Sequence, residues 1–397
     1  MWGRYRSLPR NVVAIGLVSL LNDASSEIIY PLLPVFLTAT LGASARAIGT
    51  IEGLAESMAS LLKLLAGYVS DRLAKRKPLV VAGYSLASLA RPLLAFAQSW
   101  TQVLAIRLTD RVGKGVRTAP RDAMIADTVD VAQRGLAFGF HRAMDHAGAV
   151  IGPLIGYVLV VLFVANYRFP TASEFTRIFL IASIPAAIAV LVAIFFMRES
   201  PVQVNHDTEI STLSLRGFDS NFKRFLLVLA LFTLSNSSDS FLILRATDAG
   251  VSTAMIPLLW AAHHGSKVLS SLFGGDLSDR LGRKRLIVAG WALYAAVYAG
   301  FAFAASEASL WILFLIYGLY FGLAEGAEKA LVADLVRPEQ RGTAYGLYNL
   351  AFGVTVFPAS LLMGMIWDWK GPATAFLLSA AMGAIAAVLL LILVRPR

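Results

Sequence analysis

The chain contains no cysteine and little charge. The absence of cysteine excludes disulfide bonds and thiolate metal sites. Charged residues make up only 15% of the 397 residues, hydrophobic residues make up 57%, and the mean hydropathy is +0.67. Soluble globular domains carry about 25% charged residues. The composition therefore predicts a polytopic membrane protein.

Patterns that would indicate an enzyme or an ATP-driven pump are also absent. The sequence has no G-x-x-x-x-G-K-[ST] loop for nucleotide phosphates, no H-E-x-x-H zinc motif and no nucleophile elbow. We therefore expect no enzymatic activity and no cofactor. The net charge of +10 comes from Lys and Arg in turns between apolar runs, where they face lipid head groups, so we expect no nucleic-acid partner.

Apolar runs long enough to cross a bilayer, about 20 residues each, alternate with short polar turns. We expect twelve spanning helices near 12–38, 47–70, 78–98, 100–122, 136–163, 176–197, 223–246, 252–275, 285–305, 308–332, 342–367 and 371–394. The longest polar stretch, 198–222, is the predicted cytoplasmic linker. It separates an N-terminal half, 1–197, from a C-terminal half, 223–397.

Two short basic turns repeat about half a chain length apart. The first, from Gly67 to Lys77, reads GYVSDRLAKRK, and the second, from Gly275 to Arg285, reads GDLSDRLGRKR. They resemble the signature loop G-x-x-x-D-R-x-G-R-R/K of the major facilitator superfamily, although Ala74 stands where the family prefers glycine. The resemblance implies an all-α fold of twelve transmembrane helices in two pseudo-symmetric six-helix halves.

The resemblance also implies that these turns form a cytoplasmic gate, which latches the two halves while the protein is open outward. An Asp at a helix end can cap an exposed helix N-terminus and pair with an arginine, and both contacts depend on helix placement. The alternative is that the turns only fix topology. The gate residues are Gly67, Asp71, Arg72, Gly275, Asp279 and Arg280.

The repeat extends into the predicted helices. Ser25-Ser26-Glu27 is echoed by Ser237-Ser238-Asp239, and Ala126-Asp127 is echoed by Ala333-Asp334. Two halves related in this way are typical of transporters whose site lies between them near the membrane midplane. Lys and Arg gather in alternate connections, so both termini are expected to be cytoplasmic in the inner (plasma) membrane.

Ionisable residues are unusually frequent in the N-terminal half. They are costly in a membrane and normally face a cavity or a partner. Arg111 begins a segment that resembles the R-x-x-x-G of the superfamily's fourth helix, whose arginine is associated with proton coupling. A buried carboxylate is hard to ionise unless a cation offsets it. We therefore predict proton-coupling residues at Asp23, Glu27, Glu56 and Arg111.

The remaining charges of these helices are expected to line the substrate cavity, together with fewer charges from the C-terminal half. The alternative is that the acids and bases only neutralise one another. His141 and Asp145 are four residues apart, which favours a local pair over a metal site, and we predict no metal site. The predicted cavity residues are Arg107, Asp110, Lys114, Lys63, Asp239, His263, Lys267 and Glu325.

The fifth predicted helix is rich in glycine. Its pattern resembles the antiporter motif of superfamily exporters, with Tyr157 where a second glycine is usual. Small residues allow helices to approach closely, and a Gly-Pro pair bends a helix. We expect a close, bent contact with a helix of the other half. The motif residues are Gly139, Gly148, Gly152, Pro153 and Gly156.

These features favour a proton-coupled secondary transporter that exports a small organic solute by alternating access. We expect a monomer embedded in the lipid bilayer, with protons and a small molecule as its partners. Two other transport functions stay open: uptake of an anionic metabolite, favoured by Arg107, Arg111, Lys114 and Lys63, and movement of a divalent metal, favoured by the carboxylates and histidines.

Overall fold

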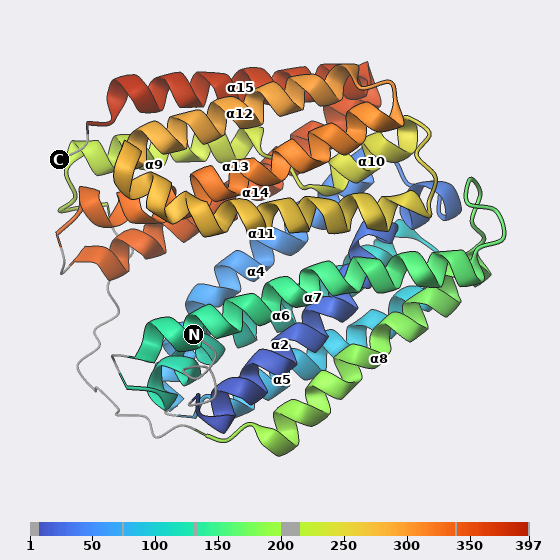
Figure 1. The fold of residues 1–397 in the computed structure, drawn as a ribbon, viewed down its shortest axis with the longest axis horizontal. Coiled ribbons are helices and arrows are strands. Elements are labelled where there is room, and N and C mark those ends of the chain that lie inside the picture. Colours follow the sequence, from blue (N-terminus) through green and yellow to red (C-terminus); the bar gives the residue numbers. More distant parts are fainter. Residues whose placement is uncertain (1–7, 74, 131–132, 200–214, 338–339, 396–397) are drawn as a thin grey trace. The chain divides into compact units, whose positions relative to one another are not determined.

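The structure is a computed structural model that describes residues 8–73, 75–130, 133–199, 215–337 and 340–395, and all regular structure in these ranges is helical (Figure 1). The first half contains α2 (Arg10–Ile29), η1 (Tyr30–Leu32), α3 (Leu33–Val35), η2 (Phe36–Thr40), α4 (Ala45–Leu73), α5 (Lys77–Ala90), η3 (Arg91–Phe96), α6 (Trp100–Thr128), α7 (Arg134–Phe163) and α8 (Ala172–Phe196).

The second half contains α9 (Ser220–Ser235), α10 (Ser240–Asp248), α11 (Met255–Leu281), α12 (Arg283–Phe303), α13 (Glu307–Leu335), α14 (Arg341–Lys370) and α15 (Pro372–Leu393). The all-α prediction is confirmed. Most of the expected linker 198–222 lies outside the described residues.

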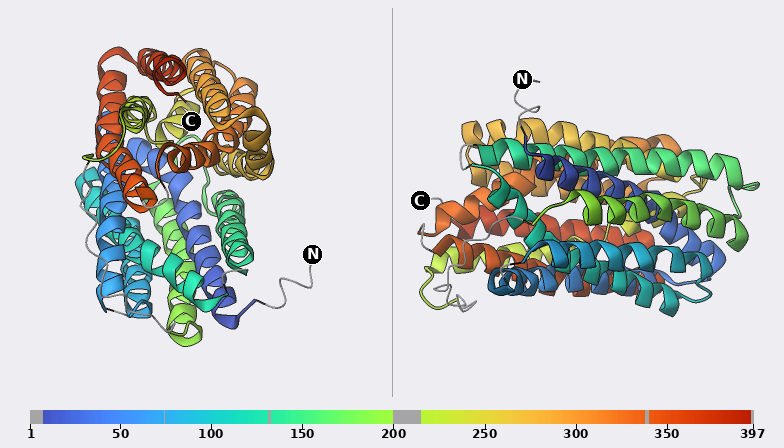
Figure 2. Two further views of the ribbon diagram at one scale, coloured as in Figure 1. Left: turned by 90° about the vertical axis from the view of Figure 1, so that its left-hand side faces the viewer. Right: turned by 90° about the horizontal axis from the view of Figure 1, so that it is seen from below.

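The chain folds into two compact units. One comprises Met1–Leu41, Met58–Ile210 and Thr253–Ala261, and the other comprises Gly42–Ser57, Ser211–Ser252 and Ala262–Arg397. Helices α4 and α11 each contribute residues to both units. Figure 2 shows the helices of each unit from the end and from the side.

Prolines explain the irregular ends of two helices in the first half. A proline inside a helix removes one backbone donor and clashes with the preceding turn. Accordingly, α2 gives way to a 3₁₀ turn that contains Pro31, and a π-helical stretch follows Pro34. Pro92 likewise lies in the 3₁₀ segment η3, which continues α5.

One expected helix is broken. The sequence predicted a continuous span over 223–246, but α9 ends at Ser235 and α10 begins at Ser240. The intervening residues, Asn236 to Asp239, are Asn, Ser, Ser and Asp, whose side chains compete for backbone hydrogen bonds. Ser238 shows this competition directly: its backbone N–H donates to Ser360 Oγ, and its own Oγ accepts from Ser240 N.

Close helix contacts hold the first unit together. Helix α2 packs against α7 and α8, and α5 packs against α6 (Figure 1). Glycines bring α5 and α6 into backbone contact, because a Cβ on Gly83 would lie 2.6 Å from the carbonyl oxygen of Gly113. An apolar core beside this contact includes Val12, Ile15 and Val18 of α2, Val80 and Tyr84 of α5, and Met124 of α6.

The core of the second unit is aromatic. Helix α12 packs against α13 and α15. The ring of Trp291 stacks on Phe232 with centroids 4.1 Å apart, and Tyr294 lies 4.1 Å from Tyr298. The hydroxyl of Tyr294 donates to the carbonyl oxygen of Ser235, the last residue of α9.

Nine helical segments in the described part of the chain are long and apolar enough to cross a membrane. The long helices α4, α6 and α11 are not among them, and they carry many of the ionisable residues singled out in the sequence. Large apolar side chains such as Leu162, Phe195 and Phe273 are exposed on the helices, as a hydrocarbon environment requires.

Candidate transport site

A buried carboxylate on α6 is the centre of an ionic network in the first unit. Asp110 Oδ1 accepts from Arg91 Nε at 3.1 Å, and its Oδ2 lies 3.9 Å from Arg107 and 4.0 Å from Arg111. Arg91 also donates to the backbone and side-chain oxygens of Asn22, both at 2.9 Å. The network therefore ties α2, η3 and α6 together.

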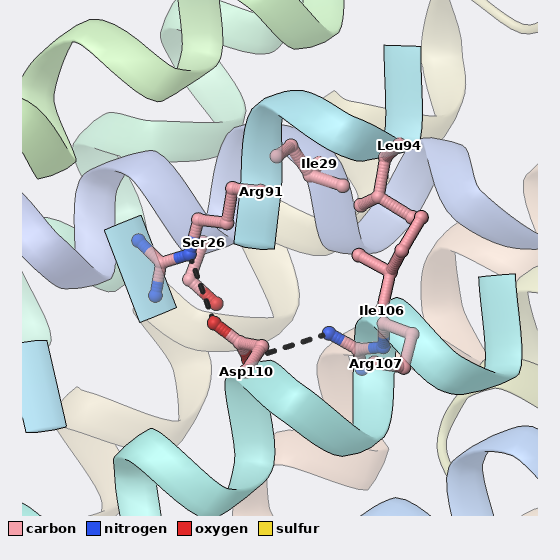
Figure 3. Close-up of a pocket in the computed structure, with 7 residues that line it drawn as sticks. All are labelled: Ser26, Ile29, Arg91, Leu94, Ile106, Arg107 and Asp110. Carbon is pink, nitrogen blue, oxygen red and sulfur yellow. Dashed lines mark hydrogen bonds and ion pairs between the residues drawn. The ribbon is translucent and has the colours of Figure 1, made fainter. Parts of the chain in front are cut away.

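A small cavity lies beside this network (Figure 3). Ser26 and Ile29 contribute to it from α2, Leu94 from η3 and Ile106 from α6, and the charged groups Arg91, Arg107 and Asp110 complete its wall. The cavity volume is about 10 Å³, the space of a single water molecule. The two predicted cavity residues Arg107 and Asp110 are thus brought together.

The carboxylate of Glu27 lies further along α2. It accepts a 2.7 Å hydrogen bond from the indole nitrogen of Trp260, whose ring lies 5.2 Å from that of Tyr30. Asp23, one turn earlier, accepts from the amide of Asn22 at 2.9 Å. Arg111, Lys114 and Asp23 are the charged residues that act on Glu27. Three of the four predicted proton-coupling residues are therefore grouped here.

The fourth predicted proton-coupling residue, Glu56, belongs to the second unit. The part of α4 that carries it, up to Ser57, groups with the second unit, and Glu56 acts electrostatically on Asp239. Lys63 lies two turns later on the part of α4 that groups with the first unit. The boundary between the two units therefore falls within α4, between Glu56 and Lys63.

The glycines of α7 pack directly on the two α2 carboxylate residues. A Cβ on Gly148 would lie 3.0 Å from the Cβ of Asp23, and a Cβ on Gly152 would lie 2.9 Å from the Cβ of Glu27. The expectation of a contact with the other half is wrong for these two glycines, since both approach α2. Gly156 is less closely packed, since a Cβ added there would lie 3.4 Å from the Ile28 carbonyl oxygen and 3.7 Å from the Cβ of Pro257.

The other two members of the glycine motif differ in their surroundings. Pro153 lies inside α7 without ending it. A Cβ on Gly139 would meet nothing within 4 Å. Gly139 is therefore not required for close packing.

A second polar network joins α2, α5 and α7. Ser19 Oγ lies 3.1 Å from the hydroxyl of Tyr84 and 2.9 Å from His141 Nε2. His141 Nδ1 lies 3.5 Å from Asp145, so the expected local pair is present. Arg121 reaches the same serine at 3.4 Å. In the described part of the chain, no group of three or more His, Asp or Glu side chains is placed to hold a metal ion.

Three of the four predicted cavity residues of the second half lie around the break between α9 and α10. Asp239 accepts a 2.7 Å hydrogen bond from the hydroxyl of Tyr317, and the ring of His263 stacks on Tyr317 with centroids 5.2 Å apart. The ammonium of Lys267 lies 3.8 Å from the ring centroid of Phe321. Asp239, His263 and Lys267 thus surround one group of aromatic rings.

Glu325 is placed differently from the prediction. It is exposed and pairs with Lys329 at 3.0 Å. One turn away, Glu328 is buried and accepts from the indole nitrogen of Trp291 at 2.8 Å and the hydroxyl of Tyr348 at 2.9 Å. The sequence held no signal for this difference, because the burial of Glu328 and its contact with Trp291 depend on packing between helices.

Only part of the predicted gate can be placed. The side chains of Asp71, Arg72 and Asp279, and the position Gly275, lie outside the described residues. A Cβ added at Gly67 would lie 3.4 Å from the Cβ of Ala119 of α6, and Arg280 is exposed at the end of α11. Gly282 has a φ of +87°, a conformation that favours glycine, and this accounts for the glycine in the second turn.

The basic residues at the end of each turn make matching contacts. Arg76 pairs with Asp127 of α6, and Arg283 pairs with Asp334 of α13. The adjacent lysines bond backbone carbonyl oxygens of the last helix of each half, Lys77 at Ile194 of α8 and Lys284 at Leu391 of α15. In the two turn sequences, Lys75 occupies the same position as Arg283. The contacts instead make Arg76 the counterpart of Arg283, one residue later.

Comparison with known proteins decides the family. The family model described as Major Facilitator Superfamily matches residues 15–262 and 224–397. The chain belongs to the Major Facilitator Superfamily. It is therefore an integral membrane protein of a secondary transporter family, a class distinct from enzymes, and the predicted twelve-helix fold class is confirmed.

Three matches describe its neighbours within this superfamily. An uncharacterised MFS-type transporter of Methanocaldococcus jannaschii is 36% identical over 97% of this chain and 95% of that protein. A homologue of the multidrug resistance efflux pump PmrA from Lactococcus lactis is 27% identical over 80% of this chain and 78% of that protein. The crystal structure of a mutant of the nucleoside transporter NupG has a TM-score of 0.81 at 15% identity, covering 97% of this chain and all of that one, which shows a shared fold alone.

Proposed function

We propose that this major facilitator protein exports a small organic solute in exchange for protons by alternating access. The observation that carries the proposal is the contact between the glycines of α7 and the carboxylate residues of α2. Gly148 and Gly152 were selected by their resemblance to an exporter motif, and Asp23 and Glu27 were selected independently as proton sites.

The contact between α7 and α2 bears on proton binding at Glu27. Glu27 is held between the backbone of α7, the indole of Trp260 and the basic residues of α6. Loss of its charge on proton binding would weaken its attraction to Arg111 and Lys114 and change the preferred position of α2 against α6. A proton and a solute that favour different arrangements would then be exchanged across the membrane.

The direction of transport is supported by similarity. The Lactococcus lactis relative is named as a homologue of a multidrug resistance efflux pump. We propose export on this basis, with the protein acting as a monomer in the inner membrane and both termini in the cytoplasm.

The test is transport in proteoliposomes with an imposed pH gradient. Counterflow of a panel of labelled solutes first identifies a substrate. Glu27→Gln is then expected to abolish substrate accumulation driven by the gradient while exchange without a gradient continues, because the neutral side chain cannot carry the proton.

Glu325→Gln serves as the matched control, since this acid is exposed and paired with Lys329. It should leave gradient-driven accumulation within about twofold of the original protein. Full accumulation by Glu27→Gln, with an unchanged dependence on pH, would show that Glu27 is not the proton site.

A further inference from the structure

The face of α7 that packs against α2 carries two ionisable side chains to which the proposed function gives no role. They are His141 and Asp145, four residues apart on one side of the helix. The same side continues with Gly148, whose added Cβ would lie 3.0 Å from the Cβ of Asp23. Asp145 therefore lies about one helical turn from the contact between α7 and the carboxylate residues of α2.

Short contacts connect this pair to α2. His141 Nε2 lies 2.9 Å from Ser19 Oγ, and His141 Nδ1 lies 3.5 Å from Asp145 Oδ2. Ser19 and Asp23 both act on the carboxylate of Asp145. Asp23 is in turn one helical turn from Glu27 on α2. Carboxyl, hydroxyl and imidazole groups thus follow one another from Glu27 to His141.

Both side chains of the pair are buried. His141 is 1% exposed, and the side chain of Asp145 is 14% exposed. Apolar side chains would hold α2 against α7 at a lower cost in desolvation. Chains of Asp, Glu and His residues within a membrane are typical of proton relays. Imidazole suits this role, because it can accept a proton at one ring nitrogen and release one from the other.

The groups around His141 favour passage of a proton over its storage. Arg121 of α6 and Arg142 of α7 act on the ring, and both oppose a positive charge on it. The hydroxyl of Tyr84, from α5, lies 3.1 Å from the same serine oxygen that His141 contacts. The part of α8 that follows Arg177 carries no ionisable residue. An imidazolium formed here would therefore lose its proton again readily.

We propose that His141 and Asp145 form a proton relay between Glu27 and the basic, cytoplasmic side of the membrane. The proposal rests on the proposed proton coupling and adds the route by which the proton leaves. His141 is about 10 Å along the helix from Arg134, the exposed first residue of α7 on that side.

Each transfer moves one proton between neighbouring groups. Asp145 receives the proton from the α2 carboxylates. Its O–H bond then breaks as an N–H bond forms at His141 Nδ1, which leaves a carboxylate and an imidazolium. The imidazolium releases its Nε2 proton to Ser19 Oγ, and the serine hydroxyl passes its own proton on to water. The ring is then neutral and Asp145 is ionised, ready for the next proton.

The first test compares two rates in proteoliposomes, with the substrate identified by counterflow. His141→Gln and Asp145→Asn should each slow substrate accumulation driven by a pH gradient about 100-fold, the lower end of the contribution of a positioned proton-transfer group. Exchange without a gradient should continue, because it needs no proton release. Arg134→Gln, which removes an exposed charge of the same helix, is the control and should leave both rates within about twofold of the original protein.

The second test is chemical rescue by imidazole. His141→Ala leaves a space where the ring was, and added imidazole can carry the proton there. The rate of gradient-driven accumulation should therefore rise with imidazole concentration in His141→Ala. The same concentrations applied to the original protein show whether the pH gradient persists. A purely structural role of the histidine would give no rescue.

The outcomes separate the relay from the proton site. If Glu27→Gln abolishes accumulation but His141→Gln and Asp145→Asn accumulate substrate at the original rate, the relay is wrong and the proton site stands. Full accumulation by Glu27→Gln would contradict both proposals. Loss of exchange in the variants, without rescue by imidazole, would also overturn the relay. If His141→Gln does not fold, Asp145→Asn decides, since it keeps the size and shape of the acid.

Discussion

At the scale of single residues, the sequence indicates the important charged residues more reliably than it indicates their partners. The sequence grouped Arg107 with Asp110, and these side chains lie 3.9 Å apart. It could not show that Glu56 lies near Asp239, because that pairing depends on tertiary packing between segments far apart in the chain. Spacing along one helix carries no information about the helix opposite.

Arg91 is the clearest residue that the sequence analysis missed. It is a single charge inside an apolar run, 4% exposed, and it bonds both Asp110 and Asn22. A lone arginine in a membrane segment needs an acidic partner, and that rule was the available signal.

Replacing Arg91 by methionine is expected to destabilise the protein by about 3–5 kcal/mol, the cost of leaving one member of a buried ion pair uncompensated. Arg91→Lys should be intermediate, because lysine keeps the charge but cannot fork to Asp110 and Asn22 together. The measurement is denaturant unfolding in detergent.

The control for this comparison is Arg177→Met, which removes an exposed arginine near the start of α8. It should change stability by less than about 1 kcal/mol. A lysine variant as unstable as the methionine variant would mean that the charge of Arg91 contributes nothing and that its shape alone matters.

At the scale of helices, glycines and polar runs determine contacts that hydropathy does not reveal. The membrane spans were predictable, because length and apolarity define them. Hydropathy did not reveal the break after Ser235, since the apolar run continues on both sides of it. The sequence Asn-Ser-Ser-Asp was the local signal for this break. It was instead interpreted only as an echo of Ser25-Ser26-Glu27, which stays helical in α2.

Gly152→Ala is expected to impair transport strongly, whereas Gly156→Ala should be mild. A Cβ at Gly152 would lie 2.5 Å from the carbonyl oxygen of Ala24, a backbone atom, so α7 must move away from α2. A Cβ at Gly156 would meet its nearest atom at 3.4 Å, an ordinary contact. Solute efflux and proton leak in proteoliposomes measure the difference.

Gly139→Ala is a control for the helix itself, since nothing lies within 4 Å of the added methyl group. Alanine favours a helix over glycine by about 1 kcal/mol, so this variant should be at least as stable as the original. Equal efflux and leak in Gly152→Ala and Gly156→Ala would contradict the argument that the packing of α7 on α2 supports export.

At the scale of the whole molecule, the internal repeat is reproduced in contacts as well as in sequence. The adjacent Arg-Lys residues 76–77 and 283–284 each connect the start of one helix to two others of the same half. The duplication was predictable from the turns, but its register was not, because a one-residue difference in turn length leaves the motif recognisable.

The two matching ion pairs should differ in strength. The side chain of Asp127 is 24% exposed and that of Asp334 is 46% exposed. Exposed ion pairs contribute about 0–1 kcal/mol, and solvent screening weakens them further. Asp127→Asn is therefore expected to destabilise the protein more than Asp334→Asn. Unfolding at low and high salt measures both, and a larger effect for Asp334→Asn would contradict the argument from burial.

The orientation of the chain in the membrane is the last prediction, and the absence of cysteine makes it directly testable. Single cysteines can be introduced without a background thiol. Lys75 lies in a turn and Arg134 at the start of α7 on the side rich in basic residues, and Gln98 and Asn166 lie in turns on the opposite side; all four are exposed. Basic connections remain in the cytoplasm, so a membrane-impermeant maleimide added to intact cells should label Gln98→Cys and Asn166→Cys only. Lys75→Cys and Arg134→Cys should react after the membrane is opened. Labelling of Lys75→Cys in intact cells, with protection of Asn166→Cys, would reverse the assigned orientation and with it the proposed direction of export.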